Sequence, residues 1–324
     1  MKILITDKIG TSGLEYLKSK AHVFEGYGLK GEALAHAAED VDGWMIRSGT
    51  QVTASLIGRA KKLKVIARAG SGVDNVDVNE ATRRGILVVN APAGNAVSAA
   101  EMTVALLLCC ARKIPQSNAS LHRHEWKRES FKGFEIFGKT VGLLGLGAVG
   151  KTVARILKGF GAHILAFDPL LTADMAKELG VTLLDKNTVI QRSDILSVHV
   201  PLTDQTRNLL SSDAFAAMKN GVVILNAARG GIVDEQALYS ALVSGKVAAA
   251  GLDVFSEEPI PPGSWSAKLV ALDNVVATPH LGASTVDAQE KVALFAAEQM
   301  VLALQGKPVQ YAVNKLHNPF GPRR

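Results

Sequence analysis

Three ionisable side chains follow short apolar runs in the C-terminal half of the chain. Arg229 stands after VVILNAA, Glu258 lies in LDVFSEEP, and His280 follows VVATP. An arginine can bind a carboxylate through two parallel hydrogen bonds, and a histidine can move a proton near neutral pH. A carboxylate on the second ring nitrogen of His280 would orient the ring and favour its protonated form. Each residue alone is compatible with a structural or surface role, but the three together indicate an active site.

A glycine-rich loop in GLLGLGAVG precedes these residues. Gly145 permits a tight turn, Gly147 lets the backbone approach a pyrophosphate, and Gly150 lets a helix pack closely on the preceding strand. Asp168 ends the next apolar run, where it can accept hydrogen bonds from both ribose hydroxyls of NAD and would repel the 2′-phosphate of NADP. The alternative for Asp168 is a turn residue before Pro169. We therefore predict a dinucleotide site that prefers NAD.

Short apolar strands alternate with helical stretches, a pattern typical of parallel sheets. Four strands are predicted first, at KILITD, GWMIRS, KVIARAG and ILVVNAP, with helices near 11–19, 31–38, 53–61 and 77–84. After a helix at about 95–112 and a polar segment, six more strands follow at TVGLLGLG, HILAFDP, DILSVHVP, GVVILNAARG, AGLDVF and NVVATPHLG. The fold class is therefore α/β.

The 324 residues exceed what one core usually holds, so two Rossmann-like domains are expected. We predict a doubly wound NAD-binding domain at 99–283. A smaller, flavodoxin-like substrate domain would comprise 1–98 and 284–324, because the last helix, at about 284–305, cannot form a domain alone. The carboxyl ends of the second set of strands would place Arg229, Glu258 and His280 beside the nucleotide.

Composition excludes several classes of protein. With 48% hydrophobic and 20% charged residues, the chain is neither disordered nor fibrous. Its longest apolar stretch, 103–111, is too short for a membrane helix, and no secretory signal is visible, so we expect a cytoplasmic protein without a membrane partner. The net charge of +6 is spread out, so nucleic acid is not expected either.

No metal site is predicted from the cysteines or histidines. Cys109 and Cys110 are adjacent in an apolar helix, which fits two core residues in a reducing compartment. Among the eight histidines only His122 and His124 lie close in sequence, on a polar segment.

The motifs that contain the glycine loop, Arg229, Glu258 and His280 resemble those of the D-2-hydroxyacid dehydrogenase family, and the resemblance extends over nearly the entire chain. Within the family it most resembles the D-3-phosphoglycerate dehydrogenase subgroup, in a short form without C-terminal regulatory domains. The resemblance rests on GRAKKLKVIARAGSGVDNVD, NAPAGNAVSAAE, GLLGLGAVG, NAARGGIVDE, LDVFSEEP and TPHLGAST. It implies an NAD-dependent oxidoreductase that acts on the CH–OH group of a D-2-hydroxy acid by hydride transfer.

The resemblance also implies roles for individual residues. Arg229 would bind and polarise the 2-oxo acid, His280 would donate and accept the proton, and Glu258 would support His280. The substrate carboxylate would lie near Ser71, Gly72 and Val73. Contacts with NAD are implied for Gly145, Gly147, Ala148, Val149, Gly150, Asp168, Val200, Pro201, Thr206, Ala227, Asp253, His280 and Gly282. A homodimer or homotetramer built through the nucleotide domains is implied as well.

The substrate stays open at this stage. Arg47, Arg68 and Arg128 match basic positions that hold the substrate phosphate in the phosphoglycerate subgroup, which would place the chain in serine biosynthesis, but each can equally be a surface charge. Position 148 is alanine where many relatives carry arginine, and feedback by serine is not expected without regulatory domains. Hydroxypyruvate, glyoxylate and sulfolactate-type substrates, phosphite oxidation, and a non-catalytic NAD-sensing co-repressor are the alternatives.

Overall fold

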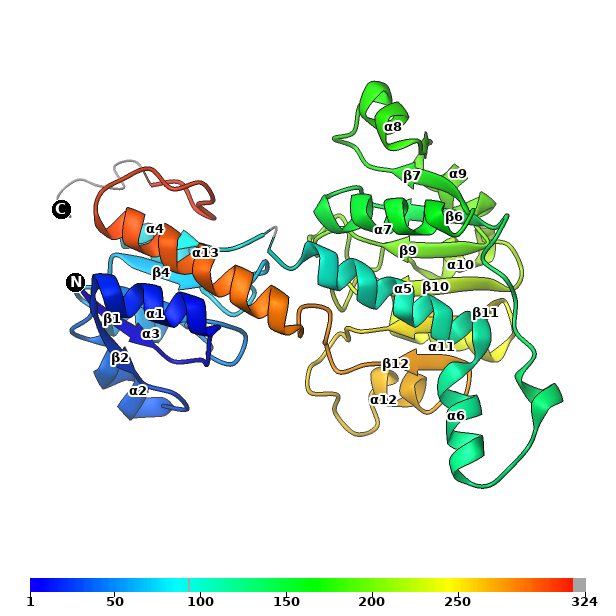
Figure 1. The fold of residues 1–324 in the computed structure, drawn as a ribbon, viewed down its shortest axis with the longest axis horizontal. Coiled ribbons are helices and arrows are strands. Elements are labelled where there is room, and N and C mark those ends of the chain that lie inside the picture. Colours follow the sequence, from blue (N-terminus) through cyan, green and yellow to red (C-terminus); the bar gives the residue numbers. More distant parts are fainter. Residues whose placement is uncertain (93, 317–324) are drawn as a thin grey trace. The chain divides into compact units, whose positions relative to one another are not determined.

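The computed structural model of the chain describes residues 1–92 and 94–316. It divides into two compact units: residues 1–96 together with the C-terminal segment from 283 form unit 1, and residues 97–282 form unit 2 (Figure 1). Ala93 of the motif NAPAGNAVSAAE and the last eight residues of the predicted substrate domain, 317–324, lie outside the described residues.

Unit 1 contains a five-stranded parallel sheet of order β2-β1-β3-β4-β5, which is the order of flavodoxin-like domains and agrees with the predicted domain type. The strands are β1 (Lys2–Ile5), β2 (His22–Glu25), β3 (Gly43–Ile46), β4 (Val65–Arg68) and β5 (Leu87–Val89). The helices are α1 (Thr11–Lys20), α2 (Gly31–Ala38), α3 (Ala54–Arg59), α4 (Val78–Arg83) and α13 (Val286–Leu304).

Both faces of this sheet are buried, because its inner strands β1, β3 and β4 are apolar apart from Lys2 at the start of β1 and Arg68 at the end of β4. In β1, Ile3 and Ile5 pack into one core with residues of α1 and α13, whereas Leu4 packs into a second core on the opposite face. α13, drawn in orange in Figure 1, lies along α1 and across the sheet. Gly13 allows that approach: a Cβ there would lie 2.5 Å from the backbone of Ala293.

The prediction of four strands in this unit was wrong, because it omitted β2. Val23 is the only half-buried residue of that strand, and its other three residues are exposed. β2 pairs with β1 on one side only. An edge strand with so little buried surface carries no apolar alternation that a sequence pattern can reveal.

Unit 2 contains a seven-stranded parallel sheet of order β12-β11-β10-β9-β6-β7-β8. Its strands are β6 (Thr140–Leu144), β7 (His163–Phe167), β8 (Thr182–Leu183), β9 (Ile195–Val198), β10 (Val222–Asn226), β11 (Val247–Leu252) and β12 (Val275–Ala277). This is the doubly wound topology, with the change of winding direction between β6 and β9. The predicted count of six was one short, because β8 has only two residues.

The helices of unit 2 cover both faces of its sheet. They are α5 (Ala96–Arg112), α6 (Ile114–His122), α7 (Ala148–Gly159), α8 (Ala173–Leu179), α9 (Lys186–Arg192), α10 (Ser212–Ala217), α11 (Glu235–Val243) and α12 (Trp265–Val270), with a 3-10 turn at Arg128–Phe131. α6 lies within the stretch predicted only as a polar segment. β10 is buried at all five positions, as its apolar run predicts.

The apolar stretch at 103–111 lies within α5, where Cys110 is buried and Cys109 is partly buried. Burial raises the pKa of the Cys110 thiol to about 12. Within residues 1–92 and 94–316, no helix has the length and apolar character that a membrane crossing requires.

Candidate active site

The glycine loop follows β6 and bends where only glycine fits. Gly145 has a φ of +99°, and a Cβ there would lie 2.7 Å from the carbonyl oxygen of His199. A Cβ at Gly150 would lie 2.3 Å from the carbonyl oxygen of Gly145. Side chains at these two positions would force apart the turn, α7 and the loop after β9, which is the packing role that the motif predicts.

Gly147 differs from these two glycines, because the space beside its Cα is open. It caps the N-terminus of α7, and an added Cβ would meet no atom within 4 Å. No described side chain caps this helix, and its first turn, which includes Ala148 and Val149, contains no acid. Amide N–H groups at a helix N-terminus bind anions well. The residues of this loop therefore fit the pyrophosphate of a dinucleotide.

Asp168 follows β7 and turns back toward the glycine loop. Its Oδ2 accepts a hydrogen bond of 2.7 Å from the N–H of Leu146, and its Oδ1 accepts one of 2.9 Å from the N–H of Leu170. These two contacts fix the plane of the carboxylate. A carboxylate has about four acceptor positions, so ribose hydroxyls can bind the same group.

The loop after β9 lies on the other side of the glycine loop. It contains Val200 and Pro201, and the hydroxyl of Thr206 donates a hydrogen bond of 2.6 Å to the carbonyl oxygen of Pro201. His199, at the start of this loop, pairs through Nε2 with the hydroxyl of Ser197 at 2.9 Å. Burial lowers the pKa of His199 to about 4, so this ring is neutral at physiological pH.

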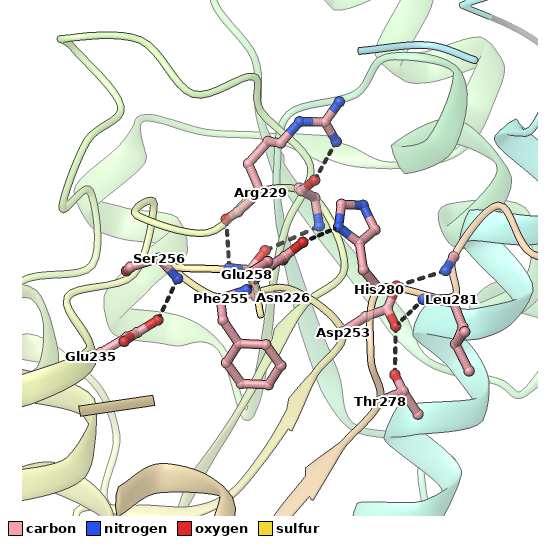
Figure 2. A network of polar contacts seen from close by, with 12 residues as sticks. Asn226, Arg229, Glu235, Asp253, Phe255, Ser256, Glu258, Thr278, His280 and Leu281 are labelled. Atoms are coloured by element: carbon pink, nitrogen blue, oxygen red, sulfur yellow. Dashed lines mark hydrogen bonds and ion pairs between the residues drawn. The ribbon is translucent and has the colours of Figure 1, made fainter. Parts of the chain in front are cut away.

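The loops after β11 and β12 bring Glu258 and His280 into direct contact. Nδ1 of His280 lies 2.6 Å from Oε2 of Glu258 (Figure 2). The other carboxylate oxygen, Oε1, accepts a hydrogen bond of 2.9 Å from the N–H of Phe255. The contact at Nδ1 therefore orients the ring of His280.

The charges around Glu258 keep its carboxylate ionised. Burial raises the pKa of this carboxyl, but the hydrogen bonds from His280 and Phe255 and the charges of His280 and Arg229 more than compensate, so the pKa lies below its ordinary value. A carboxylate that stays charged beside an imidazole favours the imidazolium form. The arrangement suits a histidine that must hold a proton before delivering it.

Arg229 comes from the loop after β10, next to the Glu258 loop (Figure 2). Asn226 holds this loop, since its Nδ2 donates to the carbonyl oxygen of Arg229 at 2.9 Å and its Oδ1 accepts from the N–H of Ala228 at 3.1 Å. Ala227 lies in the same turn. A Cβ on Gly230 would lie 1.8 Å from the carbonyl oxygen of Phe255, so the Arg229 and Glu258 loops touch through backbone.

Asp253 holds the His280 loop. It is buried, and its carboxylate accepts hydrogen bonds from the hydroxyl of Thr278 at 2.5 Å and from the N–H groups of Leu281 and Gly282 at 2.7 Å each. Its carbonyl oxygen accepts from the N–H of His280 at 2.8 Å. The resemblance implies that Asp253 and Gly282 contact the cofactor, but the sequence does not reveal that Asp253 holds this loop. A buried carboxylate needs several hydrogen-bond donors, and that requirement becomes visible only in the structure.

His280 has a left-handed backbone, with a φ of +55°. Such a conformation is unfavourable for a residue with a Cβ and occurs where surrounding contacts enforce it, often at functional sites. Here the hydrogen bonds to Asp253 supply that enforcement.

A second loop-holding acid, Glu235, also escaped prediction. It opens α11, a few residues after Arg229, and accepts from the N–H of Ser256 at 2.7 Å and from the hydroxyl of Ser266 at 2.6 Å (Figure 2). It thereby ties the loop that carries Glu258 to α11. Only its place after the motif ARGGIVD hints at this role.

The predicted substrate residues of unit 1 lie where β3 and β4 end. Arg47 follows β3, and Arg68 is the last residue of β4. Ser71, Gly72 and Val73 form the next loop, where the hydroxyl of Ser71 donates to Oδ1 of Asn95 at 2.5 Å.

Arg128 lies elsewhere, in unit 2. It belongs to the 3-10 turn beyond α6, in a segment that reaches the starts of β11 and β12 (Figure 1). Arg229, Glu258 and His280 follow the opposite ends of β10, β11 and β12, so a single chain does not bring Arg128 to them. The reason is α5, which carries the chain across the sheet before the Arg128 segment begins.

Comparison with known proteins agrees with this geometry. The family model described as "D-isomer specific 2-hydroxyacid dehydrogenase, NAD binding domain" matches residues 104–282. The chain is 45% identical over 320 residues to the D-3-phosphoglycerate dehydrogenase of Methanocaldococcus jannaschii, covering 98% of this chain and 60% of that protein. It is 48% identical over 312 residues to the enzyme of the same name from Mycobacterium tuberculosis, covering 96% and 58%. The chain thus spans about three-fifths of the length of these curated relatives.

Solved structures match over the full chain. TT0316 protein from Thermus thermophilus is 33% identical with a TM-score of 0.88, covering 97% of this chain and 100% of that one. D-lactate dehydrogenase from Escherichia coli is 30% identical with a TM-score of 0.83 and the same coverage. A glyoxylate reductase from Paecilomyes thermophila is 28% identical with a TM-score of 0.86, covering 96% and 97%. As its motifs predict, the chain belongs to the D-isomer specific 2-hydroxyacid dehydrogenase family, with an NAD-binding domain at residues 104–282.

Proposed function

We propose that the chain is an NAD-dependent dehydrogenase that interconverts a D-2-hydroxy acid and the corresponding 2-oxo acid. The observation that carries this proposal is the contact of 2.6 Å between Nδ1 of His280 and Oε2 of Glu258. It orients a histidine at the carboxyl edge of the sheet whose glycine loop fits NAD. The names of the relatives and the family model support the same reaction.

Bound NADH supplies the hydride that reduces the carbonyl carbon. Arg229 binds the substrate carboxylate and polarises the carbonyl oxygen with its guanidinium. His280 donates the proton on Nε2 to that oxygen as negative charge develops there. Glu258 stays ionised and stabilises the imidazolium before transfer. In the direction of oxidation, Nε2 of His280 accepts the hydroxyl proton.

Unit 1 is the substrate-binding domain in this proposal. Ser71, Gly72 and Val73 bind the substrate carboxylate, and Arg47 and Arg68 bind a second anionic group. A 3-phosphoglycerate-like substrate, with a place in serine biosynthesis, follows from the names of the curated relatives. Glyoxylate, hydroxypyruvate and sulfonated 2-oxo acids are the competing substrates, and a glyoxylate reductase is among the similar structures.

A homo-oligomer built through unit 2 and a cytoplasmic location belong to the same proposal. Large apolar side chains in the α6 region support the oligomer, since Ile114, Leu121 and Trp126 are 47%, 55% and 82% exposed. Light scattering coupled to size exclusion measures this: a dimer or tetramer is expected, and a monomer at micromolar concentration would contradict it.

Turnover tests the function directly. NADH oxidation is followed with 3-phosphohydroxypyruvate, 3-sulfopyruvate, hydroxypyruvate and glyoxylate, with the Arg229→Ala variant as the inactive control. We expect turnover of at least one 2-oxo acid, with the highest kcat/KM for a substrate that carries a second anionic group. A protein that binds NADH but reduces none of them would favour the co-repressor reading.

A further inference from the structure

One buried amide joins the two loops of unit 1 that carry Arg47 and Arg68. Asn75 is 8% exposed, and its amide side chain forms three of the four hydrogen bonds that it can make. Its Nδ2 donates to the carbonyl oxygen of Arg47 at 2.7 Å and to that of Thr50 at 2.6 Å. Its Oδ1 accepts from Nε of Arg68 at 3.0 Å. A single side chain thus contacts the backbone of one arginine and the guanidinium of the other.

The backbone of Arg47 is held from the opposite side by Asp7. Oδ2 of this carboxylate accepts from the N–H of Arg47 at 2.6 Å and from the N–H of Thr50 at 3.1 Å. Its Oδ1 accepts from the hydroxyl of Thr50 at 3.0 Å. Both backbone polar groups of Arg47 are therefore fixed by side chains, one by Asp7 and one by Asn75. The side chain of Arg47 therefore extends from a backbone that is held on both sides.

The guanidinium of Arg68 is fixed by its Nε contact with Asn75 and by the shape of its own loop. A Cβ on Gly70 would lie 2.4 Å from Nη1 of Arg68, so the guanidinium occupies the space that a side chain at position 70 would need. An alanine at position 70 would push the Arg68 guanidinium away, and Asn75 is not among the atoms that its Cβ would meet first. The guanidinium of Arg68 thus lies against the backbone of the loop after β4, at Gly70.

We propose that Asn75 is a positioning residue that determines specificity for substrates with a second anionic group. It does not contact the substrate. It holds the backbone of Arg47 and the guanidinium of Arg68 in place, so that less conformational freedom is lost when a phosphate or sulfonate binds to both arginines. This inference rests on the proposed function. It assigns the specificity for doubly anionic substrates to the hydrogen bonds by which the Asn75 amide joins two loops.

Three variants separate this role from a general structural one. Asn75→Ala removes the whole tie, and Gly70→Ala displaces Arg68 while leaving the contacts of Asn75 with Arg47 and Thr50. Asp77→Ala is the matched control. Asp77 lies two residues from Asn75 and caps α4 by accepting from the N–H of Glu80 at 2.8 Å, but it holds neither arginine. Circular dichroism reports whether each variant folds.

KM and kcat are measured with 3-phosphohydroxypyruvate, 3-sulfopyruvate and glyoxylate. For Asn75→Ala and Gly70→Ala we expect KM to rise about tenfold for a doubly anionic substrate, the usual effect of losing one hydrogen bond to a charged group. We expect kcat with glyoxylate to stay within about twofold of wild type. Asp77→Ala should leave both values near wild type. A loss with only one of the two doubly anionic acids would identify the group that the arginines bind.

Calorimetry of 3-phosphoglycerate and glycolate binding to the NADH-loaded protein gives the same contrast without turnover. It separates the two proposals, because a wild type without turnover overturns the proposed function, whereas the binding contrast still tests Asn75. An equal rise of KM for all three substrates, or no rise, would overturn the positioning role. If Asn75→Ala does not fold, the KM values of Gly70→Ala for the three substrates decide whether the position of Arg68 determines the specificity.

Discussion

His280 and Glu258 form a hydrogen bond in which Nδ1 of the ring lies 2.6 Å from Oε2 of the carboxylate. The partners come from the loops after β12 and β11, and backbone hydrogen bonds hold each of them. Phe255 donates its N–H to the second oxygen of Glu258, and Asp253 accepts the N–H of His280. Because Nδ1 is occupied, we expect Nε2 to be the atom through which the ring exchanges a proton with a substrate.

Replacing Glu258 by glutamine should shift the pH range of activity. The pKa of this carboxyl is lowered by its partners despite burial, so the wild-type group is charged throughout the neutral range. Glutamine keeps a hydrogen-bonding group but removes the negative charge that stabilises a positively charged ring beside it. The alkaline limit of carbonyl reduction should therefore move to lower pH, with partial activity retained. A kcat profile that superimposes on the wild-type profile would contradict this.

Arg229→Ala should weaken binding and slow chemistry together, because one guanidinium serves both the carboxylate and the carbonyl oxygen. We expect kcat to fall by about 10²-fold or more, with a rise in KM. Arg229→Lys keeps the charge but loses the two-pronged geometry, and should recover only a small part of the loss. A lysine variant with wild-type kcat/KM would show that charge alone suffices.

Asp168→Asn should reduce the preference for NADH over NADPH. The amide can still accept the N–H of Leu146, so the glycine loop keeps its shape, while the negative charge beside the 2′-position is lost. We expect the ratio of kcat/KM for the two cofactors to fall by about tenfold, which corresponds to about 1.4 kcal/mol. An unchanged ratio would mean that Asp168 does not contact the ribose.

His199 should contribute to acid sensitivity. Burial lowers its pKa to about 4 in the folded protein, whereas an unfolded histidine titrates near its ordinary value of 6.5. The unfolded state therefore binds the extra proton first, and stability is lost as the pH falls from the ordinary value toward about 4. The slope approaches about 1.4 kcal/mol per pH unit for one proton. In the His199→Gln variant the midpoint of thermal unfolding should depend less steeply on pH in this range. A dependence as steep as that of the wild type would exclude His199 as the cause of the acid sensitivity.

Much of the fold could be predicted because buried parallel strands are continuous apolar runs. β10 has five consecutive buried residues, and the glycine loop has a fixed spacing. β2 and β8 escaped because an exposed edge strand and a two-residue strand leave too little pattern. α6 escaped because it lies within a polar stretch, where apolar periodicity is weak.

The site was predictable to the extent that its residues follow strands. Arg229, Glu258 and His280 each stand after a buried run, so topology alone brings them to one edge. The loop-holding roles of Asp253 and Asn75 could not be predicted in this way, although Asp253 also follows a strand, β11. Their roles depend on hydrogen bonds between loops that are distant in sequence, and a polar residue in a loop has many possible partners.

The most direct test of the proposed chemistry is the single-turnover rate of 2-oxo acid reduction by His280→Asn, with NADH bound and its affinity measured separately. Asparagine is neutral and cannot donate an acidic proton, so the rate should fall by about 10²–10⁴-fold while the Kd for NADH stays near wild type. Added imidazole should restore part of the rate. A variant that reduces the 2-oxo acid at the wild-type rate would show that His280 is not the proton donor.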